Sequence, residues 1–359
     1  MDHGVVVWWA CYKAPVRSLP TQVDVVIVGG GFAGCATAWA LAERGVRAVV
    51  LEREPELGRQ ASGRGAGLGR QLTDDDASTE LAIRGAALLR QRFGSAWAPT
   101  GGVLSFDDPD HARGYLDRAH RLGVGHEVIG RADVVARWPV MRELPIACAL
   151  YVPGDGVIDV RQLLAAFAAT IDVVHDVAVV HVAEDRPGAR LEIARGSERR
   201  AIAAHVVVEA AGAWAGRVTD DPSLDSYKRH LFVVESAPQV DAPYLWHLGR
   251  DELYVRCDGG TTLASPCDAE PTAPLDQRPS IDSDARLRDR FAAAPRIANA
   301  AIARRWACQR AFTPDRRMRI GRDPDRPWLV WAAGLGGHGA TTSPAVGELA
   351  AAAVIAALD

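Results

Sequence analysis

A glycine-rich turn between a buried strand and a helix constrains the fold of this chain more than any other feature of its sequence. Residues 23–29 (VDVVIVG) form a nearly unbroken β-branched run, the pattern of a parallel strand that is buried on both faces. Residues 35–44 predict a helix that ends at Gly45, and residues 47–52 (RAVVLE) predict a second strand. Together these segments predict the opening unit of an α/β fold with a parallel sheet.

The turn itself carries Gly29, Gly31 and Gly34 at G-x-G-x-x-G spacing. Gly29 allows the tight turn, Gly31 lets a pyrophosphate approach the backbone, and Gly34 lets the helix lie close to the sheet. The free N–H groups and the dipole of the helix N-terminus favour the negative charge of that pyrophosphate. Glu52 ends the second strand, where an acid can accept hydrogen bonds from ribose hydroxyls. The motif therefore predicts a dinucleotide site, but it does not distinguish FAD from NAD.

Length and composition limit the classes of protein to consider. The chain has 359 residues, of which 48% are hydrophobic and 24% are charged. These values fit an ordinary water-soluble protein in which two intertwined domains share a large core. The formal net charge of −4 gives no reason to expect a nucleic acid or an anionic membrane as a partner.

The cysteines and the N-terminal residues indicate the compartment. The six cysteines form no C-x-x-C pair and no zinc-like spacing, and no secretory signal precedes the first strand. We therefore expect no metal site, reduced thiols and a cytoplasmic protein. The apolar run 5–11 is too short to span a bilayer. We expect residues 1–20 to form an N-terminal extension whose Trp8 and Trp9 pack onto the rest of the protein.

Later segments extend the same pattern. Residues 204–216 (AHVVVEAAGAWAG) predict a buried strand that leads into a turn of small residues and the start of a helix. Residues 61–71 (ASGRGAGLGRQ) predict a glycine-rich loop able to wrap a cofactor. Residues 329–358 predict a strand, a glycine-rich loop and a long helix that starts near Ser343-Pro344. Strand-like runs with turns between them predict an inserted sheet at 244–248, 252–256 and 261–265.

From about residue 23 onward, the chain resembles the flavoprotein family of D-amino-acid oxidase, glycine oxidase and monomeric sarcosine oxidase. The matching pieces occur in the family's order and read VGGGFAG, LER, ASGRGAG, GVID, AAGAWA, TPD and GHG…SPAVGE. The resemblance implies FAD as cofactor and an α/β fold in which a Rossmann-like FAD-binding domain carries an inserted α+β substrate domain on a mixed sheet. The expected FAD-binding domain comprises residues 21–95, 145–225 and 310–359, and the expected substrate domain comprises residues 96–144 and 226–309.

The motif and the resemblance together assign residues to the cofactor. The glycine-rich loop before the final helix is expected to give backbone contacts to the flavin, as it does in the family. The expected cofactor-binding residues are Gly29, Gly31, Gly34, Glu52, Arg53, Ser62, Arg64, Gly65, Ala211, Gly212, Trp214, Cys308, Gly334, Gly336, Gly337, His338, Gly339 and Thr341.

Four residues are candidates for the substrate pocket. In glycine oxidase-like members an arginine at the position of Arg310 grips the substrate carboxylate, which a guanidinium fits bidentately; the alternative is a structural salt bridge. Tyr254 matches a pocket tyrosine of the family, or it packs as a sheet aromatic. Arg70, or Gln71 beside it, falls near a carboxylate-binding arginine of sarcosine oxidase. His338 is a weaker candidate for a base, because hydride transfer from a neutral amine does not require one.

Cys308 stands five residues before Thr313-Pro314-Asp315. In sarcosine oxidase-like members a cysteine with this spacing forms a thioether with the flavin ring. In glycine oxidase-like members a glycine usually stands there and FAD is not covalently bound, and the flanking W-A-C-Q-R is closer to their W-A-G-x-R. A covalent link to Cys308 and a buried, packed thiol are both open at this point.

The chain departs from sarcosine oxidase-like members in its lysines. Those members place a lysine in G-H-G-x-K, where this chain has Thr341, and another on the inserted sheet that assists the reaction of reduced flavin with oxygen. Lys13 and Lys228 are the only lysines, and neither fits these motifs. We therefore expect an FAD-dependent enzyme that oxidises a C–N bond of an amino acid or secondary amine, with O2 or another electron acceptor. The alternatives are an amine dehydrogenase in a biosynthetic pathway and a non-catalytic FAD-binding partner subunit.

Overall fold

The predicted βαβ unit is present in the computed structural model, which describes residues 21–221, 224–237, 241–274 and 278–359. The predicted extension at residues 1–20, with Trp8, Trp9 and Lys13, lies outside the described residues. The unit consists of β1 (Gln22–Val28), α1 (Phe32–Ala42) and β2 (Val49–Leu51). β1 pairs in parallel with β2 on one side and with β12 (Glu198–Glu209) on the other. Its β-branched residues from Val25 to Val28 are buried, as a central parallel strand requires.

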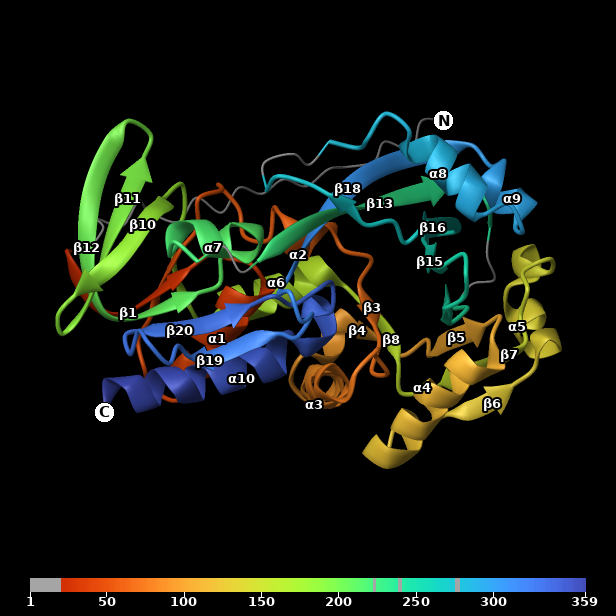
Figure 1. Ribbon diagram of the computed structural model, residues 1–359, viewed down its shortest axis with the longest axis horizontal. Helices are drawn as coiled ribbons and strands as arrows, with labels where there is room; N and C mark the ends of the chain where they lie inside the picture. Colours follow the sequence, from red (N-terminus) through yellow and green to blue (C-terminus); the bar gives the residue numbers. More distant parts are fainter. Residues whose placement is uncertain (1–20, 222–223, 238–240, 275–277) are drawn as a thin grey trace.

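The first sheet has eight strands among the described residues and forms one end of the molecule (Figure 1). The strand order is β10-β11-β12-β1-β2-β9; β20 also pairs with β12, and β19 pairs with β20. The remaining bounds are β9 (Asp172–Val174), β10 (Ala178–Asp185), β11 (Gly188–Arg195), β19 (Arg319–Arg322) and β20 (Leu329–Ala333). Because β1, β2, β9, β12 and β20 run parallel, their carboxyl ends meet at one edge of the sheet.

The second sheet has nine strands among the described residues and lies toward the opposite end of the molecule (Figure 1). Its order is β17-β13-β16-β15-β14-β5-β7-β6, with β18 paired to β13. It is mixed, as predicted, because β5 and β14 run parallel while the other pairs are antiparallel. The bounds are β5 (Gly102–Phe106), β6 (Glu127–Ile129), β7 (Cys148–Val152), β13 (Asp225–Val234), β14 (Tyr244–His247), β15 (Leu253–Asp258), β16 (Thr261–Ser265), β17 (Glu270–Pro271) and β18 (Ile302–Phe312).

One predicted domain boundary differs from the strand pairing. The expected start of an FAD-binding segment at residue 145 assigns β7 to the first domain, whereas β7 pairs with β5 and β6 in the second sheet. A small third sheet connects the two, with strands β3 (Leu68–Gly69), β4 (Trp97–Ala98) and β8 (Gly156–Ile158). The strand pairing therefore groups β7 with the second sheet.

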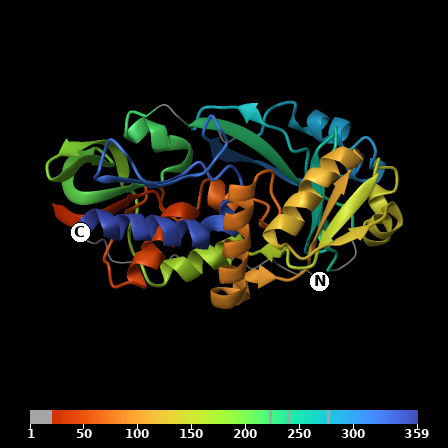
Figure 2. The same ribbon diagram turned by 60° about the horizontal axis from the view of Figure 1, so that its bottom comes forward.

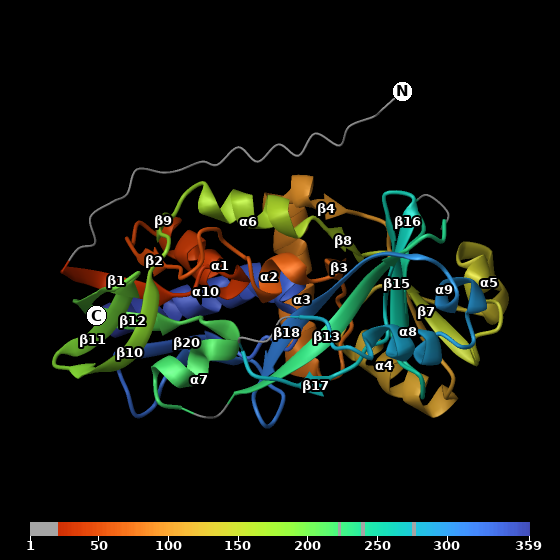
Figure 3. The same cartoon turned by 90° about the horizontal axis from the view of Figure 1, so that it is seen from above.

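The two longest strands of the second sheet, β13 and β18, reach from it toward the first sheet (Figure 3). They pair antiparallel along their length, with Arg229 opposite Cys308 and Tyr227 opposite Arg310. Residues directly opposite each other point to the same face of a sheet, as do residues two apart along a strand. The side chains of Arg229, Cys308 and Arg310 therefore share one face.

The helices pack against the sheets and against one another. α10 (Gly339–Leu358) packs against α1 and α3 (Asp76–Arg92), and Figure 2 shows α10 meeting α3 near the middle of the molecule. The other helical segments are α2 (Ala61–Arg64), α4 (Pro109–Leu122), α5 (Arg131–Arg137), α6 (Val160–Ala168), α7 (Ala215–Val218), α8 (Ser283–Arg290) and α9 (Pro295–Ala298), with short 3₁₀ turns η1 (Gly94–Ala96), η2 (Pro139–Met141) and η3 (Gly212–Trp214).

The predicted start of the last helix near Ser343-Pro344 is wrong, because α10 already begins at Gly339 and contains Pro344. The carbonyl of His338 accepts from the N–H groups of Thr341 and Thr342 and so forms the first turn ahead of the proline. By length and composition α10 would suit a membrane span, and it is the one such helix in the described part of the chain. More than half of that stretch (56%) is buried inside the protein, as in the core helix of a soluble fold.

Candidate functional site

A cavity of about 910 Å³ extends from the glycine-rich turn after β1 to the face of the second sheet that carries β13, β15 and β18. Ligand sites range over about 300–1,000 Å³, so this cavity has room for a large ligand. The predicted residues that line it are Gly29, Gly31, Glu52, Arg53, Ser62, Gly65, Arg70, Ala211, Gly212, Trp214, Tyr254, Cys308, Arg310, Gly334, Gly336, Gly337, His338, Gly339 and Thr341.

Two predicted cofactor residues, Gly34 and Arg64, are not among the lining residues. Gly34 lies behind the turn in α1, and a Cβ there would overlap the carbonyl oxygen of Gly29. It therefore shapes the turn by close packing, the role that the motif assigns to its third glycine. The Arg64 side chain instead donates hydrogen bonds to the carbonyls of Arg59 and Ala307, so it ties α2 to β18.

The start of the cavity is built from backbone at the glycine-rich turn. Gly29 has φ of +102°, and a Cβ there would lie 2.7 Å from the Ala210 carbonyl oxygen. The N-cap residue of α1, Gly31, has no side chain to cap the helix, whose first residues face the cavity. The Ser62 hydroxyl accepts from the Phe32 N–H at 2.9 Å and holds α2 against this turn. A helix N-terminus behind a tight glycine turn fits the pyrophosphate of a dinucleotide.

Glu52 and Arg53 border the same end of the cavity. The Glu52 carboxylate accepts from the N–H groups of Gly30 (2.6 Å) and Glu54 (2.8 Å), and burial raises its pKa. Beyond its predicted place beside a ribose, Glu52 thus fixes the glycine turn. The Arg53 guanidinium stacks on the Trp214 ring at 3.8 Å and forms one wall.

A second helix N-terminus, that of α10, closes the cavity from below the glycine-rich loop. Gly334, Gly336 and Gly337 in this loop all have positive φ values. A Cβ at Gly337 would also lie 2.7 Å from the Arg310 Cδ atom, so glycine there gives the arginine its space. Backbone donors and a helix dipole at this point fit the flavin ring that the resemblance implies.

Arg70 settles the register that the sequence left open between residues 70 and 71. Its side chain is 3% exposed and lines the cavity, whereas Gln71 turns away and donates to the buried Asp155. Arg70 stacks on the Trp246 ring at 4.1 Å, and its Nη2 atom lies 3.1 Å from His338 Nε2. Its Nε and Nη1 atoms are buried without a partner. Unpartnered donors of a buried cation indicate a site for an anion.

Arg310 reaches the cavity from β18, and its buried Nε atom likewise has no partner. Burial and the nearby Arg229 charge lower its pKa to about 10, so it stays protonated at neutral pH. It forms no ion pair with a carboxylate of the residues that the structure describes, so the alternative of a structural salt bridge gains no support. Tyr254 packs its ring on Trp246, with centroids 5.0 Å apart, and burial raises its pKa to about 12.

His338 is a neutral acceptor in this arrangement. Burial, followed by the charge of Arg70, lowers its pKa to about 4. Because Arg70 donates to Nε2, the ring proton of neutral His338 lies on Nδ1. The lone pair that a base would use is therefore already occupied.

This pKa predicts a pH-dependent stability. A histidine whose pKa is depressed on folding contributes stability above its unfolded pKa of about 6.5, and loses it as the pH falls toward 4. Between pH 7 and pH 5, the wild-type protein is expected to lose about 1–2 kcal/mol more unfolding free energy than His338→Gln, which keeps an acceptor for Arg70. Urea unfolding at the two pH values measures the difference, and equal losses would contradict a depressed pKa.

The lining residues that sequence reasoning missed include Arg229, Trp246 and Glu252. The Trp246 indole ring contacts both the Arg70 guanidinium and the Tyr254 ring, and its N–H donates to the Glu252 carboxylate at 2.8 Å. Alternation along β13 offered a signal for Arg229, because a charged residue stands on the same face as the apolar Leu231 and Val233. Which face meets the cavity depends on pairing with β18, far along the chain.

Cys308 lies on the face of β18 that lines the cavity and is 7% exposed. Its thiol contacts the Ala61 and Gln309 carbonyl oxygens at 3.6 Å. Burial raises the pKa of the thiol, although the charges of Arg310 and Arg229 act in the opposite direction. The thiol is accordingly protonated at neutral pH.

Comparisons with known proteins agree with the sequence resemblance. A family model described as FAD dependent oxidoreductase matches residues 24–353. Glycine oxidase of Geobacillus kaustophilus is 28% identical over 353 residues, with 92% of each chain covered. Sarcosine dehydrogenase of Mus musculus is 30% identical over 223 residues, and the match spans 57% of this chain but only 24% of that protein.

Solved structures extend the comparison to the fold. The crystal structure of the Geobacillus kaustophilus glycine oxidase superposes with a TM-score of 0.80 at 26% identity, covering 94% of this chain and 95% of that one. L-proline dehydrogenase from P. horikoshii gives a TM-score of 0.83 at 23% identity, with 93% of each chain covered, and so shares the fold. The predicted mixed α/β architecture is confirmed.

Proposed function

Because the chain belongs to the FAD dependent oxidoreductase family, we propose that it oxidises the C–N bond of an amine that carries a carboxylate. The observation that carries this proposal is that two buried guanidinium groups, those of Arg70 and Arg310, keep nitrogen atoms without a partner in a cavity that continues into the glycine-rich turn. An amino acid or an N-substituted amino acid offers both the oxidisable bond and the anion.

FAD, when bound, supplies the hydride acceptor. The protein's own contribution is binding and orientation. Its glycine turn and the α1 N-terminus hold the pyrophosphate, and the α10 N-terminus and glycine-rich loop border the flavin ring. Arg310 binds the substrate carboxylate through paired N–H donors, and Arg70 assists from the Trp246 side. Tyr254 and Trp246 form the apolar wall that excludes water from the reacting carbon.

His338 serves as a positioning residue in this proposal. Its Nε2 accepts from Arg70, so the ring holds that guanidinium toward the cavity. The amine enters in its neutral form and needs no strong protein base, which agrees with the low pKa of His338, about 4.

The proposal for the electron acceptor rests on where the two lysines of the chain lie. Lys228 is buried on β13 but does not line the cavity, and Lys13 lies outside the described residues. We propose that electrons pass mainly to an acceptor other than O2, because no lysine among the described residues borders the site. Slow reoxidation of the reduced holoenzyme in air, compared with an added dye acceptor, is the expected observation. We also propose a cytoplasmic location, which five free cysteines in the described chain support.

We propose that FAD is held without a covalent bond to Cys308, since the thiol is protonated and its neighbours are carbonyl oxygens. Acid precipitation of the purified holoenzyme is expected to release the flavin into the supernatant, and Cys308→Ser should behave identically. A yellow pellet from the wild type that turns colourless in Cys308→Ser would instead establish the thioether.

Turnover measurements test the proposed activity. With a dye as acceptor, we expect reduction in the presence of at least one member of a panel of D-, L-, N-methyl and cyclic amino acids, with formation of an oxo acid or a cyclic imine. The matched control is the corresponding amine without the carboxylate, which should react poorly. Reaction of the control amines alone would point to a different substrate class.

A further inference from the structure

A third arginine, Arg229 on β13, enters the same cavity and has no role in the function proposed so far. It is 7% exposed, and its side chain shares a face with Cys308 and Arg310. Arg229 stands directly opposite Cys308, so Arg310 is its diagonal neighbour across the two strands. Such neighbours have Cα atoms about 7–8 Å apart, a spacing that two groups of one small molecule can bridge.

The Arg229 guanidinium is held in place by backbone. Its Nη2 atom donates to the Cys267 carbonyl at 2.9 Å and its Nε atom to the Asp268 carbonyl at 3.3 Å. Cys267 adopts a left-handed backbone conformation, with φ of +52°, which residues other than glycine rarely adopt. In this conformation its carbonyl accepts from the Arg229 guanidinium. No acceptor among the described residues contacts Nη1, so this donor is available to a ligand.

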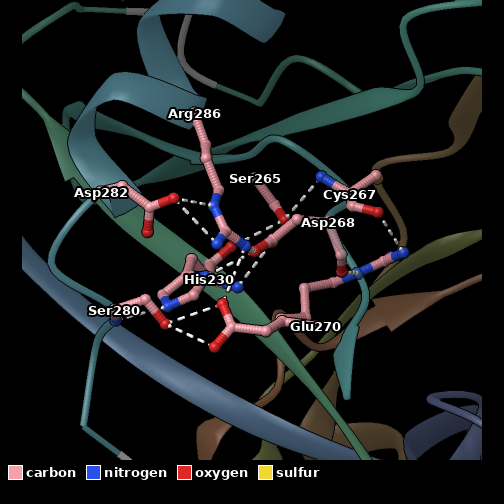
Figure 4. A network of polar contacts seen from close by, with 9 residues as sticks. His230, Ser265, Cys267, Asp268, Glu270, Ser280, Asp282 and Arg286 are labelled. Carbon is pink, nitrogen blue, oxygen red and sulfur yellow. Dashed lines mark hydrogen bonds and ion pairs between the residues drawn. The ribbon is translucent and has the colours of Figure 1, made fainter. Parts of the chain in front are cut away.

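A polar network outside the cavity fixes the segment that supplies these carbonyls (Figure 4). Asp268 bonds to the buried His230 ring at 2.5 Å and to Arg286 at 3.4 Å, and Arg286 also pairs with Glu270 at 2.8 Å. Ser280 joins the network through its hydroxyl, which donates to the Glu270 carboxylate. The side chains of this network do not line the cavity, and they hold the segment whose carbonyls accept from Arg229.

Among the described residues, Arg229 forms no direct ion pair with a carboxylate. Both of its hydrogen-bond partners are neutral carbonyls, and neither Arg229 nor Arg310 forms an ion pair in the part of the chain that the structure describes. Arg70 has one carboxylate, Asp74, at 3.7 Å. Glu252 also lines the cavity, where it accepts from the Trp246 indole. A buried guanidinium that is hydrogen-bonded only to neutral carbonyls favours a further anion within reach of its free donor.

We propose that Arg229 binds a second carboxylate of the substrate, so that the site takes an amino or imino dicarboxylic acid. This inference rests on the proposed function, because Arg310 holds the first carboxylate. The C–N bond then lies between two anchored ends, and a monocarboxylic amine satisfies only one of the two guanidinium groups.

Binding of unreactive acids to the holoenzyme tests this inference without turnover. Butyrate and succinate have the same number of carbons and differ by one carboxylate, and each can be titrated against the flavin absorbance. We expect succinate to bind the wild type about 10- to 100-fold more tightly than butyrate, as charge-assisted hydrogen bonds of a buried group allow. In Arg229→Met this advantage should disappear while butyrate binding stays unchanged.

Two further variants and a stability readout keep the test decisive. Arg229→Lys keeps the charge and should retain part of the preference for succinate, and Arg304→Met removes an exposed arginine of β18 and should change nothing. Flavin content and melting temperature identify any variant that fails to fold. If Arg229→Met fails to fold, the preference of Arg229→Lys for succinate over butyrate is the result that tests the inference.

The other outcomes separate the two proposals. If Arg229→Met weakens butyrate and succinate equally, Arg229 serves the first carboxylate or the cofactor, and the dicarboxylate inference is overturned while the proposed function stands. If the wild type binds both acids equally, the inference is likewise overturned. If neither acid perturbs the flavin of any variant, the proposed function fails with it.

Discussion

Replacing Arg310 with methionine is expected to lower kcat/KM for a carboxylated amine by about 100- to 1,000-fold. The variant removes a guanidinium that carries an unpartnered donor into the cavity, and truncating one partner of a buried, hydrogen-bonded charge pair costs about 2–5 kcal/mol. Methionine keeps the length and apolar contact of the side chain, so the change is confined to charge and donors. Steady-state kinetics with a saturating dye acceptor measure the effect.

Two comparisons isolate the carboxylate contribution of Arg310. Arg304→Met makes the same substitution on the same strand at an exposed position and should leave kcat/KM unchanged. An amine without a carboxylate should react at the same low rate with the wild type and with Arg310→Met. If Arg310→Met instead slowed both substrates equally, the arginine would act on the cofactor or the fold, and the assignment of the carboxylate site would be wrong.

Gly34→Ala is expected to destabilise the protein by about 3 kcal/mol and to abolish flavin binding. A Cβ at Gly34 would overlap the Gly29 carbonyl oxygen, which is a backbone atom and cannot turn aside as a flexible side chain would. Separation of α1 from the turn would misplace the N–H groups that face the cavity, so the cofactor is lost together with the stability. Chemical denaturation and the ratio of flavin to protein absorbance measure the two effects.

Gly114→Ala supplies the matched control for Gly34→Ala. Gly114 is an exposed glycine inside α4, and a Cβ there meets nothing within 4 Å. Alanine should therefore stabilise that helix by about 0.5–1 kcal/mol and leave flavin content unchanged. Full flavin content in Gly34→Ala would show that α1 can move away from the turn, and would contradict the close packing seen here.

Local sequence patterns were sufficient for the dinucleotide half of the site. β1, the glycine turn, α1 and Glu52 follow one another within about thirty residues, and each carries a signal of its own, from β-branched periodicity to glycine spacing. The structure adds that the Glu52 carboxylate also fixes the turn through the Gly30 N–H. The strands of the inserted sheet were predicted on the same local grounds.

The substrate half could be predicted only in part, because it depends on contacts between distant segments. Arg70 and His338 meet across 268 positions of sequence, and burial, followed by the charge of Arg70, lowers the pKa of His338. That Arg229 shares a face with Cys308 and Arg310 follows from the pairing of β13 with β18. The start of α10 was predicted too late, because proline usually marks the first turn of a helix, whereas here the helix begins five residues before Pro344.

Anaerobic titration of the purified holoenzyme with carboxylated amines tests the central claim most directly. The visible absorbance of the flavin reports reduction without requiring any particular electron acceptor. The structure predicts that at least one carboxylated amine bleaches this absorbance, and that the matched amine without a carboxylate does not at the same concentration. An oxidised spectrum that persists with every carboxylated amine of the panel would contradict the account, and would leave a flavin-binding protein without this activity.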